Sequence, residues 1–237
     1  MCGRYVTPEE AAIERFWHIG RHNIRNPLAQ RFNVSPTAIV PILRLADDGT
    51  LEEVAARWGL IPFWWKDAKP PRLTFNARSE EAATKPMWRH PASNARCLVP
   101  AMGWYEWKEV ERVDPATGEV KKAKQRHFIR LPDGRPIAFA GLMSRQNIEG
   151  DKSEFTCTIM TRDAVGPATE IHTRMPIALP KDAEAAWLNP GVTDAAAAIE
   201  MARGRAVTEF VHHPANPRVN NARNEGAELI EPFANPA

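Results

Sequence analysis

The sequence predicts an α+β protein: a single mixed domain with a largely antiparallel, barrel-like β core and flanking helices. The expected strands are short, alternate apolar with polar residues, and follow one another through turns. The 237 residues can bury one sizeable core, and no repeat, low-complexity tract or linker divides them. We therefore expect one domain over residues 1–237, with a polar tail from about residue 214 that packs on it or extends from it.

The N-terminal segment predicts a short extended start over residues 2–6, followed by a helix. Thr7 is the expected N-cap, Pro8 the first helical residue, and Glu10 completes a capping box. The helix is expected to run to about His18.

An antiparallel pair of strands follows. Residues 38–45 are apolar and β-branched, which predicts a strand. Residues 47–49 are Asp-Asp-Gly, a composition typical of turns, and residues 54–60 are expected to form the partner strand. Residues 61–73 are rich in Pro and Trp, which predicts an irregular surface loop.

The rest of the chain continues this mixture. Turn residues at 114–118 predict one hairpin, and those at 132–134 predict another that joins residues 125–131 to 137–143. Further strands are expected at 96–100, 103–110, 155–161 and 210–211. Further helices are expected at 79–83, 87–92, 181–188 and 194–202.

The amino-acid composition argues against secreted, membrane-spanning, disulfide-rich and zinc-binding proteins. With 43% hydrophobic and 25% charged residues, the chain has the balance of a soluble globular protein. The sequence shows no signal peptide and no apolar run long enough to span a bilayer. Cys2, Cys97 and Cys157 are odd in number and widely spaced, so neither a disulfide framework nor a zinc site is indicated. We expect a cytoplasmic protein with no metal and no cofactor.

Charge is concentrated in residues 57–96. This segment holds eight basic and three acidic residues, a net +5 in a chain whose total is +2. Trp58, Trp64, Trp65 and Trp88 lie within it. Cations mixed with exposed aromatics suit single-stranded nucleic acid, because phosphates need charge and unstacked bases need flat partners. The alternative interpretation is a tryptophan-rich core with a solvated rim.

Cys2 is the most informative single residue. Its small side chain allows Met1 to be removed, which leaves an α-amine and a thiol on adjacent carbons. Their reference pKa values, near 7.7–8.0 and near 8.5, keep a fraction of each reactive at neutral pH. An aldehyde can condense with the amine to an imine, and the thiol then closes a five-membered thiazolidine ring. The alternative interpretation is a small, inert, buried cysteine.

Four motifs in order resemble one known family. They are Met1–Tyr5 (MCGRY), Asn76–Glu80 (NARSE), Arg96–Trp107 (RCLVPAMGWYEW) and Ile171–Pro176 (IHTRMP). The resemblance to the SOS-response-associated peptidase family, which shields abasic sites, extends to residues 225–230. It implies a sensor of abasic sites in single-stranded DNA whose Cys2 forms a thiazolidine crosslink with the ring-opened sugar. We expect this protein to be a monomer without membrane association, and to associate with the nucleoid when bound to DNA. Autoproteolysis before the cysteine, and reversal or lyase-type elimination, are further activities that it implies.

The resemblance also implies site residues. Asn76 would hold the amine or the sugar oxygen, Glu106 would shuttle protons with a raised pKa, and His172 would act as acid or base in opening the sugar ring. Each also has a structural interpretation: a turn-forming asparagine, an outward-facing carboxylate paired to a cation, and a structural histidine. Where the family commonly has an aspartate in its His-x-Arg motif, this chain has Thr173. If that carboxylate orients the histidine, another group must do so here.

DNA contacts are implied for a second set of residues. Arg78 and Arg174 are expected to bind phosphate through their guanidinium forks, and the alternative for each is a surface salt bridge. The full set of expected DNA-binding residues is Arg4, Trp64, Trp65, Arg78, Thr161, Arg162 and Arg174.

Two other function classes share some of these features. An N-terminal-nucleophile peptidase or amidase would also use Cys2 and a nearby base, but it would turn over and leave no DNA adduct. A non-catalytic single-strand-binding module would bind intact and abasic strands alike, would weaken steeply with salt, and would not depend on Cys2.

Overall fold

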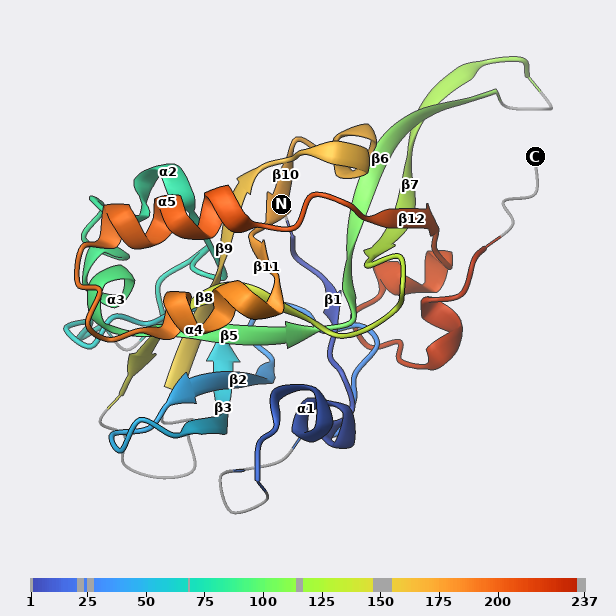
Figure 1. The fold of residues 1–237 in the computed structure, drawn as a ribbon. Helices are drawn as coiled ribbons and strands as arrows, with labels where there is room; N and C mark the ends of the chain where they lie inside the picture. The colour runs from blue at the N-terminus through green and yellow to red at the C-terminus, as the bar shows by residue number, and fades with distance from the viewer. Residues whose placement is uncertain are drawn as a thin grey trace.

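The computed structural model describes residues 2–20, 24, 28–67, 69–113, 117–146 and 155–233. Within them the chain forms two sheets, with most of the helices gathered against the larger sheet (Figure 1). The predicted α+β class with a barrel-like, mainly antiparallel core is confirmed.

The larger sheet forms the centre of the molecule. Its strands run in the order β10-β9-β3-β2-β5-β8-β11, with β4 added beside β9. Because β9 pairs with both β3 and β8, the sheet curls into an incompletely closed ring. The strands are β2 (Ile39–Leu45), β3 (Leu51–Trp58), β4 (Asn76–Arg78), β5 (Arg96–Ala101), β8 (Ile137–Arg145), β9 (Phe155–Asp163), β10 (Arg174–Pro176) and β11 (Ala178–Leu179).

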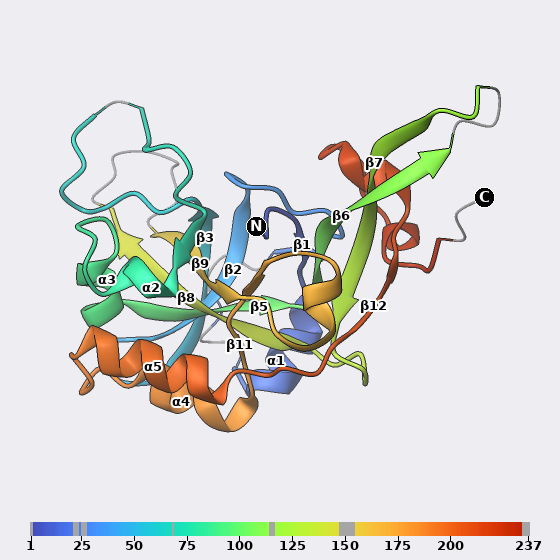
Figure 2. The same cartoon turned by 90° about the horizontal axis from the view of Figure 1, so that it is seen from above.

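The smaller sheet has the order β1-β6-β7-β12 and is antiparallel throughout. Its strands are β1 (Tyr5–Val6), β6 (Gly103–Val113), β7 (Val120–Arg130) and β12 (Val211–Pro214). The far halves of β6 and β7 leave the body of the molecule as a two-stranded arm (Figures 1 and 2).

The helices are short, and within the described residues none is long and apolar enough to cross a membrane. They are α1 (Glu10–Trp17), α2 (Ser79–Ala82), α3 (Arg89–Asn94), α4 (Lys181–Leu188) and α5 (Ala195–Arg205), with the 3-10 turns η2 (Gly166–Glu170), η3 (Pro217–Asn220) and η4 (Ala227–Leu229). Asp194 caps α5, since its carboxylate accepts from the amides of Ala196 and Ala197.

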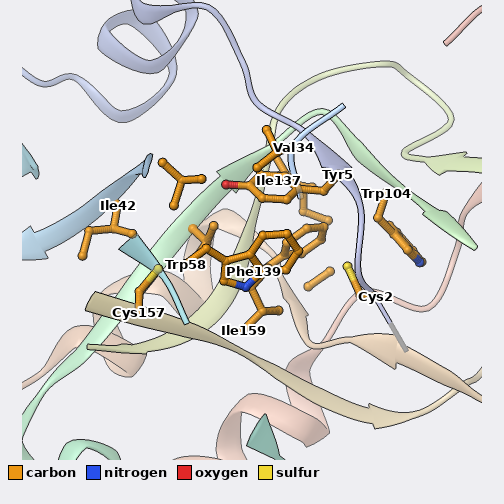
Figure 3. Packing of buried hydrophobic residues seen from close by; sticks show 14 of the residues in the cluster. Cys2, Tyr5, Val34, Ile42, Trp58, Trp104, Ile137, Phe139, Cys157 and Ile159 are labelled. Carbon is orange, nitrogen blue, oxygen red and sulfur yellow. The ribbon is translucent and has the colours of Figure 1, made fainter. Parts of the chain in front are cut away.

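Three apolar clusters hold these layers together. One fills the inside of the ring and reaches the smaller sheet, and it includes Cys2, Tyr5, Trp58 and Trp104 (Figure 3). A second joins the larger sheet to α1, α3, α4 and α5. A third lies between the smaller sheet and the C-terminal turns, around Tyr105. Burial of these apolar side chains is the main stabilising contribution to the fold.

The predicted capping box at the first helix is wrong. The helix begins at Glu10, with Glu9 as an N-cap that makes no side-chain hydrogen bond. The hydroxyl of Thr7 instead accepts from the amide of Arg31 at 2.8 Å, so a contact distant in sequence replaces the local cap.

The predicted hairpin between residues 125–131 and 137–143 is also wrong. Both strands exist, but β7 pairs with β6 and β12 whereas β8 pairs with β5, β9 and β11. The segment between them leads from one sheet to the other. The turn predicted at 114–118 falls partly outside the described residues, although β6 and β7 do pair up to Val113 and Val120.

Candidate active site

Cys2 is placed by the first strand of the smaller sheet. Tyr5 lies opposite Trp104, and the amide of Tyr105 donates to the carbonyl of Arg4 at 2.9 Å. Because the two segments are antiparallel, the residues before Arg4 continue along β6 toward Glu106. Cys2 is fully buried at this point.

Asn76 approaches Cys2 from the larger sheet. The short strand β4 lies parallel to β9, with Asn76 beside Ile159, and this pairing fixes the side chain. Its Nδ2 donates to the carbonyl oxygen of Cys2 at 2.7 Å. The amide oxygen of Asn76 is buried and accepts no hydrogen bond from the described residues, so it is available to a further donor at this site.

Glu106 supplies a buried carboxyl group at the same site. Its residue is 2% exposed, and burial raises its pKa to about 7, against the opposing charge of the chain's amino terminus. At neutral pH both its protonated and ionised forms are therefore populated. Burial first, and the negative charge of Glu106 second, raise the pKa of the Cys2 thiol well above its ordinary value.

His172 follows the 3-10 turn η2, and its ring is oriented by the backbone. The amide of Arg174 donates to Nδ1 of His172 at 2.9 Å. The neutral ring therefore carries its proton on Nε2. Burial, followed by the charge of the amino terminus, lowers the pKa of His172. The backbone thus controls the tautomer that an aspartate in place of Thr173 was expected to control.

The structure links three of the four predicted catalytic residues to one another. Asn76 donates a hydrogen bond to Cys2, and the negative charge of Glu106 acts on the Cys2 thiol. The amino-terminal charge that lowers the pKa of His172 belongs to Met1. Cys2 precedes β1, Asn76 lies on β4, Glu106 lies on β6 and His172 follows η2, so the predicted catalytic residues come from four distant parts of the sequence.

The two candidate stacking residues lie on the predicted surface loop. Trp64 is 44% exposed, and Trp65 is half-buried with its ring nitrogen donating to the carbonyl of Lys69 at 3.0 Å. Their ring centroids are 6.0 Å apart. By contrast, Trp58 and Trp88 are core residues. Of the four tryptophans in the basic segment, only the two on the loop can therefore offer an aromatic surface.

Arg174 already has carboxylate partners. It forms a two-pronged ion pair with Glu80, with both Nη–Oε distances at 3.0 Å, and a third contact with Asp163 at 2.6 Å. Its Nη2 also donates to the carbonyl of Thr161 at 2.9 Å, and Thr161 itself is fully buried. The ion pair joins two of the sequence motifs, one carrying Glu80 and the other carrying Arg174.

The other predicted DNA-binding arginines differ in their surroundings. Arg4 donates to Asn33 at 2.9 Å and to the carbonyl of Val219 at 3.1 Å, which ties the N-terminal strand to the C-terminal turns. Arg162 donates to the carbonyl of Arg203 at 2.7 Å, near the end of α5. Arg78 is exposed at the end of β4, two residues from Asn76.

Comparison with known proteins places this chain in a family. Residues 1–222 match the SOS response associated peptidase (SRAP) family. The chain belongs to the SRAP family. It is 35% identical over 234 residues to the abasic site processing protein YoqW of Bacillus subtilis, covering 98% of this chain and 99% of that protein. It is 36% identical over 243 residues to the abasic site processing protein YedK of Escherichia coli, covering 98% and 100% respectively.

The SRAP fold is also recognised among solved structures. A crystal structure of a protein from Bacteroides thetaiotaomicron superposes with a TM-score of 0.75 at 22% sequence identity, covering 98% of this chain and all of that one. Within the part of this SRAP chain that the structure describes, no group of three or more His, Cys, Asp or Glu side chains is arranged to hold a metal ion.

One polar residue beside the SRAP site was missed by sequence reasoning. His127 on β7 lies directly opposite Glu106 on β6 and is buried. The alternation of residues 125–131 predicted a strand, but the partner assigned to that strand was the wrong one. The correct register would have revealed the pair.

Proposed function

We propose that this chain captures abasic sites in single-stranded DNA through a covalent thiazolidine formed by Cys2 after Met1 is removed. The observation that carries the proposal is the hydrogen bond from Asn76 to the Cys2 carbonyl, with the Glu106 carboxyl acting on the adjacent thiol. The relatives named abasic site processing proteins support the choice of substrate.

The reaction balances without a co-reactant. The Cys2 amine nitrogen attacks C1′ of the ring-opened sugar, and the resulting carbinolamine loses its hydroxyl group as water to give an imine. Sγ then bonds to the imine carbon, and the ring nitrogen keeps one proton. The oxygen of the water comes from the aldehyde, and its two hydrogens come from the amine and the thiol. No electron acceptor is needed.

The electrostatics favour attack by the amine before the thiol. The raised pKa of the Cys2 thiol keeps it protonated at neutral pH, whereas a free α-amine has a reference pKa near 8. A thiol attacks mainly as the thiolate, so it becomes the better nucleophile once a positively charged imine nitrogen forms next to it. The first covalent step is therefore assigned to nitrogen and the second to sulfur.

Glu106 and His172 are assigned complementary proton-handling roles. Glu106, with a pKa of about 7, can take a proton from the ammonium form of the amine and return one to the departing hydroxyl group. Neutral His172 carries its proton on Nε2 and can donate a hydrogen bond to a sugar oxygen. Asn76 holds the Cys2 backbone, so the amine and thiol stay aligned.

Strand binding is assigned to the exposed part of the basic segment. Trp64 offers a flat surface for an unstacked base, and Arg78 lies two residues from Asn76 with its side chain exposed. For Arg174, binding of a phosphate would require exchange of the Glu80 and Asp163 carboxylates for phosphate oxygens.

The test combines intact mass with DNA capture. Protein lacking Met1 is mixed with single-stranded DNA that carries one abasic site, and the adduct is measured after heating in denaturant. We expect a mass equal to protein plus DNA minus one water. Cys2→Ala is expected to abolish the adduct, and an adduct in this variant at the wild-type level would disprove the proposal.

Two matched variants sharpen the result. Cys97→Ala removes another fully buried cysteine and is expected to leave the adduct unchanged. An added residue before Cys2, with the thiol intact, is expected to abolish it because the ring needs the free α-amine. Turnover of a peptide or amide substrate without any lasting DNA adduct would instead support the N-terminal-nucleophile hydrolase.

A further inference from the structure

A buried histidine, His127, is the cross-strand neighbour of Glu106. His127 lies opposite Glu106 in the antiparallel register of β6 and β7, so the two side chains project from the same face of the sheet. Its residue is 6% exposed, and neither ring nitrogen has a hydrogen-bond partner among the described residues. Buried polar groups are almost always hydrogen-bonded, so an exception calls for an explanation other than stability.

The ring of His127 contacts a second histidine that lies closer to the surface. Its ring lies against that of His212 on β12, with centroids 5.2 Å apart and planes at 71°. His212 in turn places Nε2 3.5 Å from a carboxylate oxygen of Glu170, whose side chain is 62% exposed. Glu106, His127, His212 and Glu170 thus form a series of side chains that runs from the buried carboxyl group to solvent.

The charges around His127 keep its ring neutral. Burial is the main cause that lowers the pKa of His127 to about 4, followed by the charges of His212, Lys108 and His213, whereas Glu170 acts in the opposite direction. A neutral imidazole has one donor and one acceptor nitrogen. It can therefore accept a proton on one side and release another on the opposite side without storing a charge in the core.

We propose that His127 is a positioning residue that relays protons between Glu106 and the exposed pair formed by His212 and Glu170. This inference rests on the proposed function of Cys2. When the amine starts as an ammonium group, the condensation releases one proton as well as one water. Glu106 takes a proton from the ammonium nitrogen and returns one to the departing hydroxyl group. The surplus proton, which the thiol gives up on ring closure, passes from Glu106 to one ring nitrogen of His127, leaves from the other, and reaches solvent through His212.

The test uses the full chain without Met1 and two variants. His127→Gln keeps hydrogen-bonding groups but cannot relay, and His127→Ala leaves a cavity that imidazole can enter. The rate of adduct formation is measured from about pH 5 to about pH 9, a range that brackets the reference pKa values of His and the amine. We expect both variants to react roughly 10-fold more slowly, below the effect of a directly acting acid–base group. Added imidazole should restore the rate of His127→Ala only.

His213→Gln is the matched control. Its ring lies against Phe128 on the other face of the sheet, with centroids 5.9 Å apart, and its Nε2 contacts the carbonyl of Ile230 at 2.8 Å. The charge of His213 is only a minor cause of the lowered pKa of His127, so this variant is expected to keep the wild-type rate with at most a small shift of its pH profile. Thermal unfolding of all three variants reports any loss of stability.

Two outcomes would overturn the relay. One is a wild-type rate in His127→Gln, which would show that hydrogen bonding suffices. The other combines two results. Imidazole fails to restore the rate of adduct formation in His127→Ala, and the rate in His127→Gln falls only in proportion to its loss of stability. Failure of the proposed function is distinguishable, because an adduct in Cys2→Ala would contradict that function whatever His127 does.

Discussion

Two buried glutamates illustrate how one residue type takes different roles. Glu106 and Glu53 both have a pKa raised to about 7, chiefly by burial. The charge of Glu106 acts on the Cys2 thiol, and a carboxyl group that exchanges protons at neutral pH is useful there. Glu53 lies on β3 and is influenced by the negative charges of Glu10 and Glu14 on α1. We infer a chemical role for the first and a cost to stability for the second.

Replacing Glu106 should remove a proton-transfer step from adduct formation. Glu106→Gln keeps the size of the side chain but cannot accept the proton of the ammonium group. We expect adduct formation to slow by about 10²-fold or more, and the rate to lose its dependence on a group of pKa about 7. The rate constant is measured by quenched-flow or gel assay across pH. Retention of the wild-type profile in this variant would contradict the role given to Glu106.

Replacing Glu53 should change how the free energy of unfolding depends on pH. The pKa of Glu53 is raised in the folded chain, from 4.5 to about 7, so the native state binds more protons than the unfolded state between these values. The free energy of unfolding should therefore fall as pH rises through this window, by about 1–3 kcal/mol for this group, and stay low above it. Glu53→Gln is expected to lose that part of the decline.

Urea unfolding at about pH 5 and about pH 8 measures the change directly. Glu209→Gln, which removes an exposed carboxylate, is the control and should keep the full wild-type decline. An unchanged decline in Glu53→Gln would show that the burial of this carboxyl group does not bias its protonation.

At the residue scale, the sequence predicted the types of catalytic group but not their partners. Motif order identifies Cys2, Asn76, Glu106 and His172, and the structure links the first three through the Asn76 hydrogen bond and the charge of Glu106. His127 was missed because its importance depends on cross-strand register with Glu106. Register is set by long-range pairing, which a local pattern does not specify.

At the scale of elements, alternation predicted where strands occur but not which strands pair. The strands β7 and β8 are close in sequence, yet they belong to different sheets. Their burial explains the difference: β8 is buried on both faces from Ile137 to Leu142, as a central strand is, whereas the first half of β7 is largely exposed. A short turn-forming segment between two alternating runs was therefore insufficient evidence for a hairpin.

The surface loop over residues 61–73 offers a direct test of strand binding. In a Cys2→Ala background, where binding is reversible, Trp64→Ala should weaken the affinity for single-stranded DNA by about 1–3 kcal/mol because one stacking surface is lost. Fluorescence anisotropy measures the affinity. Leu73→Ala removes another exposed apolar side chain from the same loop, 76% exposed, and should bind as the parent does. Equal loss in both variants would argue against stacking by Trp64.

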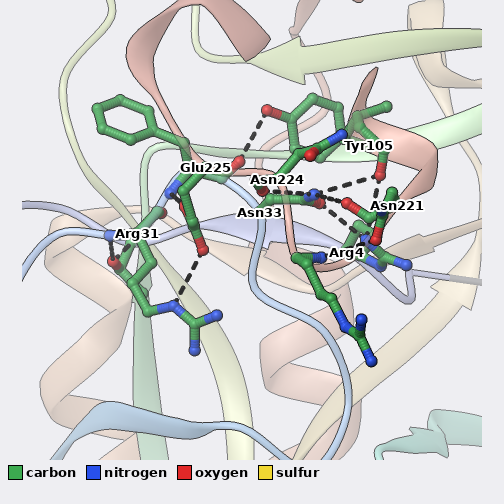
Figure 4. A network of polar contacts seen from close by, with 11 residues as sticks. Arg4, Arg31, Asn33, Tyr105, Asn221, Asn224 and Glu225 are labelled. Atoms are coloured by element: carbon green, nitrogen blue, oxygen red, sulfur yellow. Dashed lines mark hydrogen bonds and ion pairs between the residues drawn. The ribbon is translucent and has the colours of Figure 1, made fainter. Parts of the chain in front are cut away.

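At the scale of the whole molecule, the C-terminal turns hold the start of the chain in place. Asn33 is fully buried, accepts from Arg4 at 2.9 Å and donates to the carbonyls of Asn221 and Asn224 at 2.9 and 3.0 Å (Figure 4). Glu225 adds a contact with the amide of Phe32 at 2.8 Å. The sequence predicts a polar tail there that packs on the domain or extends from it, but it does not predict these contacts, because contacts between chain ends leave no local pattern.

Removing the centre of this network should therefore affect both stability and the site. Asn33→Ala leaves the guanidinium of Arg4 without one of its acceptors and the carbonyls of Val219, Asn221 and Asn224 without their amide donor, which should cost about 2 kcal/mol or more. Because Arg4 lies two residues from Cys2, adduct formation should also slow while the protein remains folded. Urea unfolding and the adduct assay measure the two effects.

Asn94→Ala is the appropriate comparison for that loss. Asn94 is exposed, and its amide donates only to the carbonyl of His90 within the same short helix, at 3.2 Å. This variant should change the free energy of unfolding by less than about 0.5 kcal/mol and should leave the adduct rate unchanged. If Asn33→Ala were destabilised but still formed the adduct at the wild-type rate, the C-terminal turns would support the fold without positioning Cys2. A slower adduct in a folded Asn33→Ala protein would instead link the two ends of the chain to the chemistry at Cys2.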